Sequence, residues 1–246
     1  MVGTRNQKIR VVLQDRDREI LRILGILRVA TRQQLQGLSG FNSRSRSSAR
    51  LSALVDAGYL HRDFIGTIKG GRLAVYMQPT NRIRPRNGPA GLEAALNHHL
   101  AVADVYCLTQ IRLRTHPDTR FDWTTPELPK ASGIIPDGTF TLATSDKATT
   151  CYLEVDLGTE GHEVWKGKID RYLSLARSVQ VTAPTADRFR VLIVVPSVRR
   201  LESLRTLISK ATDKLFWLTT LQQIKSEGLF ASIWLRPRSA ELLSLL

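Results

Sequence analysis

Cysteine is scarce in this sequence of 246 residues, which contains only Cys107 and Cys151. The two are far apart and form no CxxC pair, which excludes a disulfide framework and a cysteine-rich zinc site. Both lie within apolar segments (VADVYCL and TTCYLEV), which favours reduced thiols in a hydrophobic core. This use of cysteine predicts a cytoplasmic protein.

Long hydrophobic runs are also missing. The longest, such as Val191–Pro196, have the length of a strand and fall well short of the roughly 20 residues that a membrane-spanning helix needs. The first ten residues are basic and polar, without the apolar centre of a secretory signal. Hydrophobic residues make up 42% of the chain and charged residues 24%, as in ordinary globular proteins. We therefore expect a globular protein without a membrane partner.

Acidic residues are few in the first third of the chain. Residues 1–90 contain 17 Lys and Arg against 5 Asp and Glu, whereas residues 91–246 contain 19 against 17. Nearly all of the net charge of +14 therefore belongs to the first third. Such a concentration of positive charge favours a polyanionic partner, here double-stranded DNA, over a basic face without a ligand. The Pro-, Gly- and Arg-rich segment 82–91 predicts a linker between domains at 1–81 and 92–246.

The N-terminal domain has the pattern of a winged helix-turn-helix. Apolar residues at helical spacing predict a helix capped by Asp15, and the capping residues Thr31 and Ser43 predict two more. Two alternating runs around Lys69-Gly70-Gly71 predict a β-hairpin. Helix, short helix, helix and hairpin follow one another as in a winged helix-turn-helix, whose third helix enters the DNA major groove.

The third predicted helix and the hairpin tip provide the candidate DNA-binding residues. These are Arg44, Arg46, Ser47 and Arg50 on the helix, and Lys69 and Arg72 at the tip. Arginine on such a helix can donate paired hydrogen bonds to guanine, and we expect Arg46 and Arg50 to read bases in this way. Lys69 and Arg72 are expected to contact the DNA backbone. A winged helix that contacts another protein is the alternative.

The C-terminal domain alternates strands and helices. The pattern predicts a long helix over 91–115, three strands within 120–160, a helix that begins near His162, and then strand, helix and strand. The run at 189–197 is nearly all apolar, which is typical of a strand covered on both faces. This order predicts an α/β sandwich with a central mixed sheet.

Three acidic residues fall on neighbouring strands of this predicted sheet. Glu154 and Asp156 are two residues apart, so they share a face, and Asp137 on the preceding strand can join them. Carboxylates are the ligands that Mg²⁺ or Mn²⁺ prefers, and such an ion can activate water against a phosphodiester. The alternative is structural: Glu154 pairs with Arg171 or Lys168, and Asp137 caps a turn.

The segments IIPDG and CYLEVD resemble the PD-(D/E)xK motif of the restriction-endonuclease-like superfamily. The resemblance implies metal binding by Asp137 and Glu154, and it places Asp156 where the superfamily has a lysine that positions the attacking water. Lys168 is the first candidate for a relocated lysine and Lys166 the second. The resemblance therefore implies a catalytic set of Asp137, Glu154, Asp156 and Lys168. Two hypotheses follow: a Mg²⁺- or Mn²⁺-dependent DNA endonuclease, or an inactive unit for DNA binding or assembly.

The layout as a whole resembles the replication-relaxation family of plasmids and other mobile elements. The features that carry this resemblance are HHLAVADVY, WTxPEL, IIPDG, YLEVDLGTE, WxxKIxxY, FRVLIVVPSxRRL and LFWLTT, in this order after the winged helix. The resemblance implies a double-stranded-DNA-binding protein that acts at an origin or transfer site in replication or mobilisation. Candidate partners besides DNA are a replication, relaxase or recombination protein and a second copy of the chain. The alternatives are an endonuclease or nickase, and a winged-helix transcription regulator.

Overall fold

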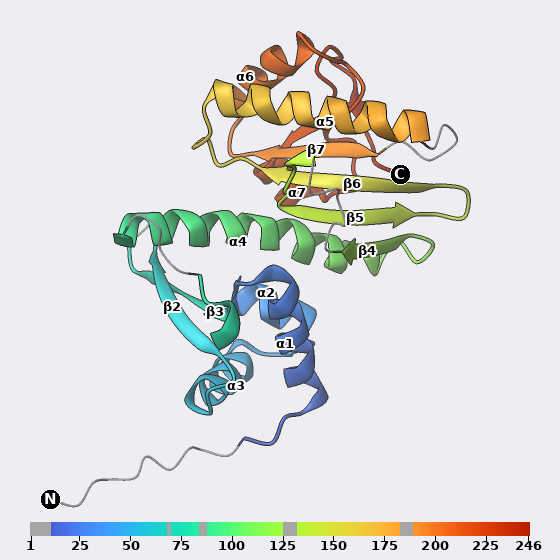
Figure 1. Ribbon diagram of the computed structural model, residues 1–246. Coiled ribbons are helices and arrows are strands. Elements are labelled where there is room, and N and C mark those ends of the chain that lie inside the picture. The colour runs from blue at the N-terminus through green and yellow to red at the C-terminus, as the bar shows by residue number, and fades with distance from the viewer. Residues whose placement is uncertain (1–10, 68–69, 84–87, 125–131, 183–188) are drawn as a thin grey trace, which may run out of the picture. The chain divides into compact units, whose positions relative to one another are not determined.

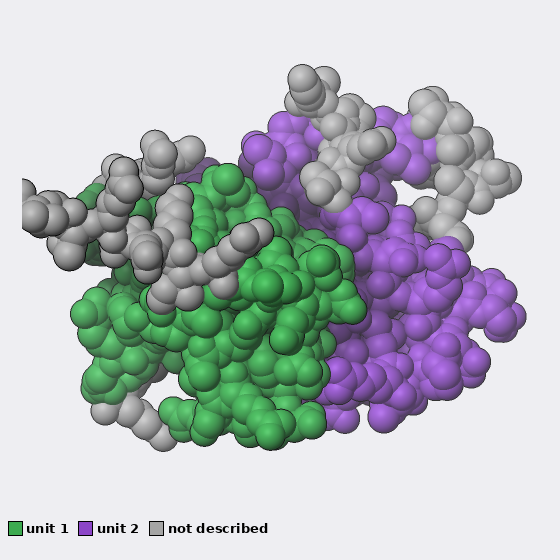
Figure 2. Space-filling view, turned by 90° about the horizontal axis from the view of Figure 1, so that it is seen from below, with its two compact units in different colours: residues 1–107 green, residues 108–246 purple. Residues whose placement is uncertain are grey.

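The computed structural model describes residues 11–67, 70–83, 88–124, 132–182 and 189–246. The chain forms two compact units, Met1–Cys107 and Leu108–Leu246, which Figure 2 distinguishes by colour. Among the described helices, none combines the length and the hydropathy of a membrane-spanning segment.

The two units divide inside the long helix α4 (Gly88–Leu113), and not at residues 82–91, where the composition predicts a linker. The first half of α4 belongs to the N-terminal unit because Leu96 and Leu100 are buried in its core. They pack there with apolar residues of the hairpin, such as Val75. The helix that was predicted to open the second domain thus begins as part of the first.

The N-terminal unit has the predicted order of elements (Figure 1). They are α1 (Asp15–Leu27), β1 (Ala30–Thr31), α2 (Arg32–Leu38), α3 (Arg44–Asp56), β2 (His61–Gly66), β3 (Arg72–Met77) and a short 3₁₀ turn, η1 (Pro79–Asn81). The strands form an antiparallel sheet in the order β1-β3-β2. Three helices followed by a hairpin is the order of a winged helix-turn-helix. The two-residue strand β1 and the turn η1 are elements that the sequence pattern did not predict.

The helix starts in this unit follow from their capping residues. The Thr31 hydroxyl accepts a hydrogen bond from the Gln34 backbone N–H at the start of α2, and the Ser43 hydroxyl accepts one from Arg46 at the start of α3, both as predicted. The prediction for α1 was wrong, because the N-cap residue is Gln14 and the acidic side chain that bonds back to it is Asp17, not Asp15. The Asp17 carboxylate accepts a hydrogen bond of 2.7 Å from the Gln14 backbone N–H.

The C-terminal unit is built on a seven-stranded mixed sheet in the order β10-β9-β8-β7-β6-β5-β4. Its elements after α4 are β4 (Arg120–Thr124), β5 (Gly138–Ala143), β6 (Ala148–Val155), α5 (His162–Thr182), β7 (Arg190–Val195), α6 (Val198–Ser209), β8 (Phe216–Thr220), α7 (Leu221–Glu227), β9 (Trp234–Leu235) and β10 (Leu242–Leu243). β4, β5 and β6 pair antiparallel, whereas β6, β7 and β8 pair parallel. The predicted order and the central mixed sheet are confirmed.

The helices α5 and α6 cover one face of this sheet, and Figure 1 shows α5 running across it. Their apolar residues pack onto β7 and β8, with Trp165 and Leu204 completely buried against Ile193. Leu192 and Val194 of β7, which point to the opposite face, are buried as well. The strand is therefore covered on both sides, as its uninterrupted apolar run predicted.

All four tryptophans of the chain belong to the C-terminal unit: they are Trp123, Trp165, Trp217 and Trp234. The N-terminal unit contains none. Tryptophan fluorescence therefore originates in the C-terminal unit.

Candidate functional site

The first turn of α3 presents basic side chains to solvent. Arg44, Ser45 and Arg46 are all exposed, and Ser43 fixes the start of the helix just before them. Arg44 and Arg46 therefore lie on an outward surface, as the sequence predicted. In a winged helix-turn-helix, this end of the third helix carries the side chains that reach base edges.

Ser47, which the sequence analysis named as a candidate DNA-binding residue, does not share that surface. It is completely buried, and its hydroxyl donates a hydrogen bond of 2.9 Å to the Arg44 carbonyl and contacts the Gln36 side chain at 3.2 Å. The reason is helical spacing: Ser47 precedes the buried Leu51 and Leu54 by four and seven residues, so it continues their stripe.

Arg50 is bound inside the unit. Its guanidinium donates two hydrogen bonds to the buried carboxylate of Asp17 on α1, one of them at 2.9 Å, and a third of 2.8 Å to the Val12 carbonyl. Burial is the largest single influence and opposes ionisation of Asp17. The hydrogen bonds from Arg50 and the Gln14 N–H, with the positive charges of Arg50 and Arg16, together outweigh it and lower the pKa of Asp17; the bond to Asp17 raises the pKa of Arg50. The Arg50 guanidinium, which we expected to read bases, joins α3 to α1.

The hairpin carries a second basic surface. The Arg72 guanidinium is exposed and lies 4.9 Å from the centre of the Phe64 ring, and that of Arg62 lies 5.7 Å from the same ring. Phe64 is itself 40% exposed. Arg62 and Phe64 escaped the sequence analysis, although their spacing of two along a strand is the signal for a shared face. Lys69 lies outside the described residues.

The acidic residues predicted on the second unit lie where β5 and β6 meet. The Asp137 backbone N–H donates a hydrogen bond of 2.9 Å to the Leu153 carbonyl, and the Asp137 carboxylate accepts one of 2.7 Å from the Val155 N–H. These two bonds hold Asp137 just before β5, against the end of β6. The next residue, Gly138, leaves room for the Trp123 ring: a Cβ there would lie 2.3 Å from two ring carbons. The glycine of IIPDG is therefore required by packing.

Glu154 is 2% exposed and lies on β6 with both carboxylate oxygens engaged. One accepts a hydrogen bond of 2.6 Å from the Tyr172 hydroxyl, and the other accepts 2.8 Å from the Lys168 ammonium. Burial raises the pKa of Glu154, and the neighbouring charge of Asp137 raises it further; Lys168 and Tyr172 oppose this but do not reverse it. Asp137, Glu154 and Lys168 are thus brought together. Tyr172 is the member that sequence reasoning missed.

Lys168 bridges two carboxylates. Its ammonium lies 2.8 Å from Glu154 and 2.8 Å from Glu160, and 4.9 Å from the centre of the Trp165 ring. The other lysine considered, Lys166, instead pairs with Glu163 on the same exposed turn of α5.

Of the two proposed structural partners of Glu154, Lys168 is the one in contact. Arg171 donates to the backbone carbonyls of Gly167 and Gly133.

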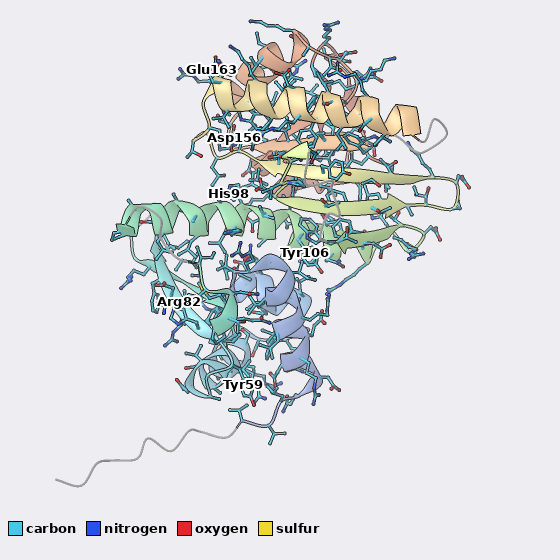
Figure 3. The ribbon with its side chains drawn as sticks, in the orientation of Figure 1. Tyr59, Arg82, His98, Tyr106, Asp156 and Glu163 are labelled. Atoms are coloured by element: carbon cyan, nitrogen blue, oxygen red, sulfur yellow. The ribbon has the colours of Figure 1, made fainter. Side chains whose placement is uncertain are left out.

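Asp156, labelled in Figure 3, has a separate set of partners. One carboxylate oxygen accepts a hydrogen bond of 2.6 Å from the Gly158 N–H. The other accepts hydrogen bonds of 2.8 Å from the Trp165 indole N–H and 2.8 Å from Arg200 Nε. The whole Asp156 residue is 2% exposed. Arg200 was not foreseen, because it is 44 residues further along the chain and nothing in the local pattern links the two.

This donor set does not fit the three-carboxylate metal site that the strand spacing predicts. Asp156 is held by an arginine, and Glu154 by a lysine and a tyrosine, so their oxygens already have cationic or hydrogen-bonding partners. Within the described ranges, no group of three or more His, Cys, Asp or Glu side chains has the arrangement of a metal site. We therefore derive no metal-dependent step from it.

Comparison with known proteins identifies the family. The profile described as Replication-relaxation matches residues 21–192, which is more than half of the chain. The chain belongs to the replication-relaxation family. Residues of both units fall within the match. The comparison with curated proteins found no match.

Among solved structures, the chain is similar to the restriction endonuclease FokI. It shares 14% identity with a FokI structure at a TM-score of 0.33, covering 87% of this chain and 44% of that one. With FokI bound to DNA it shares 12% identity at a TM-score of 0.31, covering 90% and 47%. The chain thus spans less than half the length of either.

Proposed function

We propose that this member of the replication-relaxation family binds double-stranded DNA through its N-terminal unit, at an origin or transfer site of a plasmid or other mobile element. The observation that carries the proposal is the pair of exposed arginines, Arg44 and Arg46, on the first turn of α3. The charge of the surrounding sequence supports it, because residues 1–90 contain 17 basic and 5 acidic side chains. Membership of the replication-relaxation family supports an action on DNA.

The structure changes which residues we expect to contact DNA. Arg44 and Arg46 remain the candidates on α3, and Arg72 on the hairpin, together with Arg62 beside it. Arg50 supports them indirectly, because its bond to Asp17 fixes how α3 lies on α1.

The test is a titration of labelled duplex DNA with the full chain at several salt concentrations. Binding should weaken steeply with salt, since each phosphate contact releases counterions. Arg44→Ala combined with Arg46→Ala should lower the affinity and flatten the salt dependence. Arg120→Ala, an exposed arginine on β4 of the other unit, is the matched control. Failure of the unaltered chain to bind duplex DNA at low salt would sink the proposal.

A metal-dependent endonuclease is the second candidate function. One observation favours it: Asp137, Glu154 and Lys168 come together in the order of the two half-motifs. The donor set opposes it, because Glu154 and Asp156 are already engaged by Lys168 and Arg200. We therefore expect supercoiled plasmid to stay intact with the protein and Mg²⁺ or Mn²⁺. Nicking that disappears in Asp137→Ala would establish the endonuclease instead.

A further inference from the structure

Each carboxylate at the end of β6 has a cation of its own from a neighbouring helix. Glu154 is paired with Lys168 of α5, and Asp156 with Arg200 of α6. Both acidic side chains are almost completely shielded from solvent, at 3% and 1% exposure, whereas Lys168 and Arg200 are 21% and 16% exposed. Each cation thus closes its carboxylate off from solvent.

Lys168 occupies the position of a cation that bridges two carboxylates. Its ammonium contacts Glu154 and Glu160 at 2.8 Å each, so one positive charge serves two carboxylates from different parts of the chain. A divalent ion in an acidic site does the same with ligand bonds of roughly 2–2.6 Å. The lysine is held in place by the Trp165 ring beneath it.

The two ion pairs belong to one connected cluster. The indole of Trp165 donates its N–H to Asp156 while its ring contacts the Lys168 ammonium. Arg200 also donates to the Glu160 carbonyl, and the Glu160 carboxylate contacts Lys168. These contacts join β6, α5 and α6 at one end of the sheet, and displacing Lys168 would disturb both pairs.

We infer that Lys168 and Arg200 are built-in cations that take the place of a divalent ion, so that the nuclease-like site of this chain is a closed, metal-independent structural site. A metal ion on the Glu154 oxygen that faces Lys168 would compete with an ammonium that also contacts Glu160. A metal ion on the Asp156 oxygen that faces Arg200 would compete with that guanidinium and with the indole N–H. The inference concerns the second unit and stands independently of DNA binding by the first.

The first test needs no variant. Full-length protein is titrated with Mn²⁺ while free Mn²⁺ is followed by its paramagnetic resonance signal, and thermal unfolding is followed by tryptophan fluorescence, with Mn²⁺, Mg²⁺ or EDTA. We expect free Mn²⁺ to stay equal to the amount added, and the unfolding temperature to be the same in all three solutions. Saturable Mn²⁺ binding that raises the unfolding temperature and is lost in Glu154→Gln would overturn the inference.

The second test asks whether Lys168 carries the charge balance. Lys168→Met should lower the unfolding temperature of the second unit by roughly 5–10 °C, because a buried carboxylate loses its cation. Lys166→Met, whose lysine is exposed on the same helix, is the matched control and should leave it unchanged. Should Lys168→Met not fold, Lys168→Met combined with Glu154→Gln removes both charges and should restore folding. A Lys168→Met protein that unfolds at the temperature of the unaltered chain contradicts the inference.

Discussion

Arg50 of α3 and Asp17 of α1 form an ion pair between helices whose partners are 33 residues apart in the sequence. The Asp17 carboxylate is fully shielded from solvent and also caps α1 by accepting from the Gln14 N–H. One side chain therefore starts the first helix and fixes the third. This pair positions the surface that we propose for DNA binding, but neither of its two side chains is proposed to contact DNA.

Asp17→Asn should destabilise the N-terminal unit by roughly 1–3 kcal/mol at neutral pH, because Arg50 and the cap lose their charged partner. Since folding lowers the pKa of Asp17, its stabilisation is present above the ordinary value of 3.8 and is lost as pH falls through the lower folded value. The difference in stability of the N-terminal unit between the variant and the unaltered chain should therefore shrink in acid. Hydrogen exchange of α3 amides measures it, with the exposed Asp15→Asn as control. An equal loss of hydrogen-exchange protection in Asp17→Asn and Asp15→Asn would contradict the role assigned to the pair of Asp17 and Arg50.

Arg46→Ala should weaken binding to the preferred duplex by about 1–3 kcal/mol and reduce the preference over unrelated DNA, if the side chain reaches a base edge. Arg72→Ala should weaken all duplexes alike and lower the salt slope by about one unit, as loss of a phosphate contact does. Competition titrations with preferred and scrambled duplexes separate the two. Identical behaviour of the two variants would refute this division of roles.

Gly138→Ala should destabilise the C-terminal unit by about 1–3 kcal/mol, because the added Cβ would meet the Trp123 ring at 2.3 Å and force it to move. Gly161→Ala is the matched control, since its Cβ would have no neighbour within 4 Å. Denaturant unfolding followed by tryptophan fluorescence gives both values. Equal stability of the two variants would show that the ring adapts without cost.

Glu154→Gln should change how the stability of the C-terminal unit depends on pH. Folding raises the pKa of Glu154 above its ordinary value of 4.5, chiefly through burial, so the folded form binds this proton more tightly than the unfolded chain. This contribution to stability therefore falls as pH rises from 4.5 through the folded value. The variant lacks the titration and should lose less stability across that range. Unfolding temperatures from tryptophan fluorescence at several pH values test this, and parallel curves would contradict it.

The order of elements could be predicted because it depends on local signals. Thr31 and Ser43 cap helices through neighbours three residues away, and the mostly apolar run at 189–197 is typical of a strand covered on both faces. The short strands β9 and β10 escaped prediction because two residues carry no period. The division within α4 escaped it because Leu96 and Leu100 choose their core by tertiary packing.

The candidate site was predictable only in part, and for a similar reason. Lys168 could be named because it lies within the first two turns of α5, the helix that follows the strand of Glu154. Ser47 could have been placed correctly from its spacing to Leu51 and Leu54. The partner of Asp156 could not be named, because Arg200 reaches it only once α6 has folded onto the sheet.

The separation between Glu154 and Lys168 also has a use in comparing sequences. The lysine follows its glutamate by 14 positions, on a different element, rather than by two on the same strand. A search pattern that demands the adjacent lysine would therefore pass over chains of this type. A pattern that pairs the strand acid with a lysine one helix turn or two into α5, and a tyrosine four residues beyond it, would recover them. It would also sort them from relatives whose acids lack such a partner.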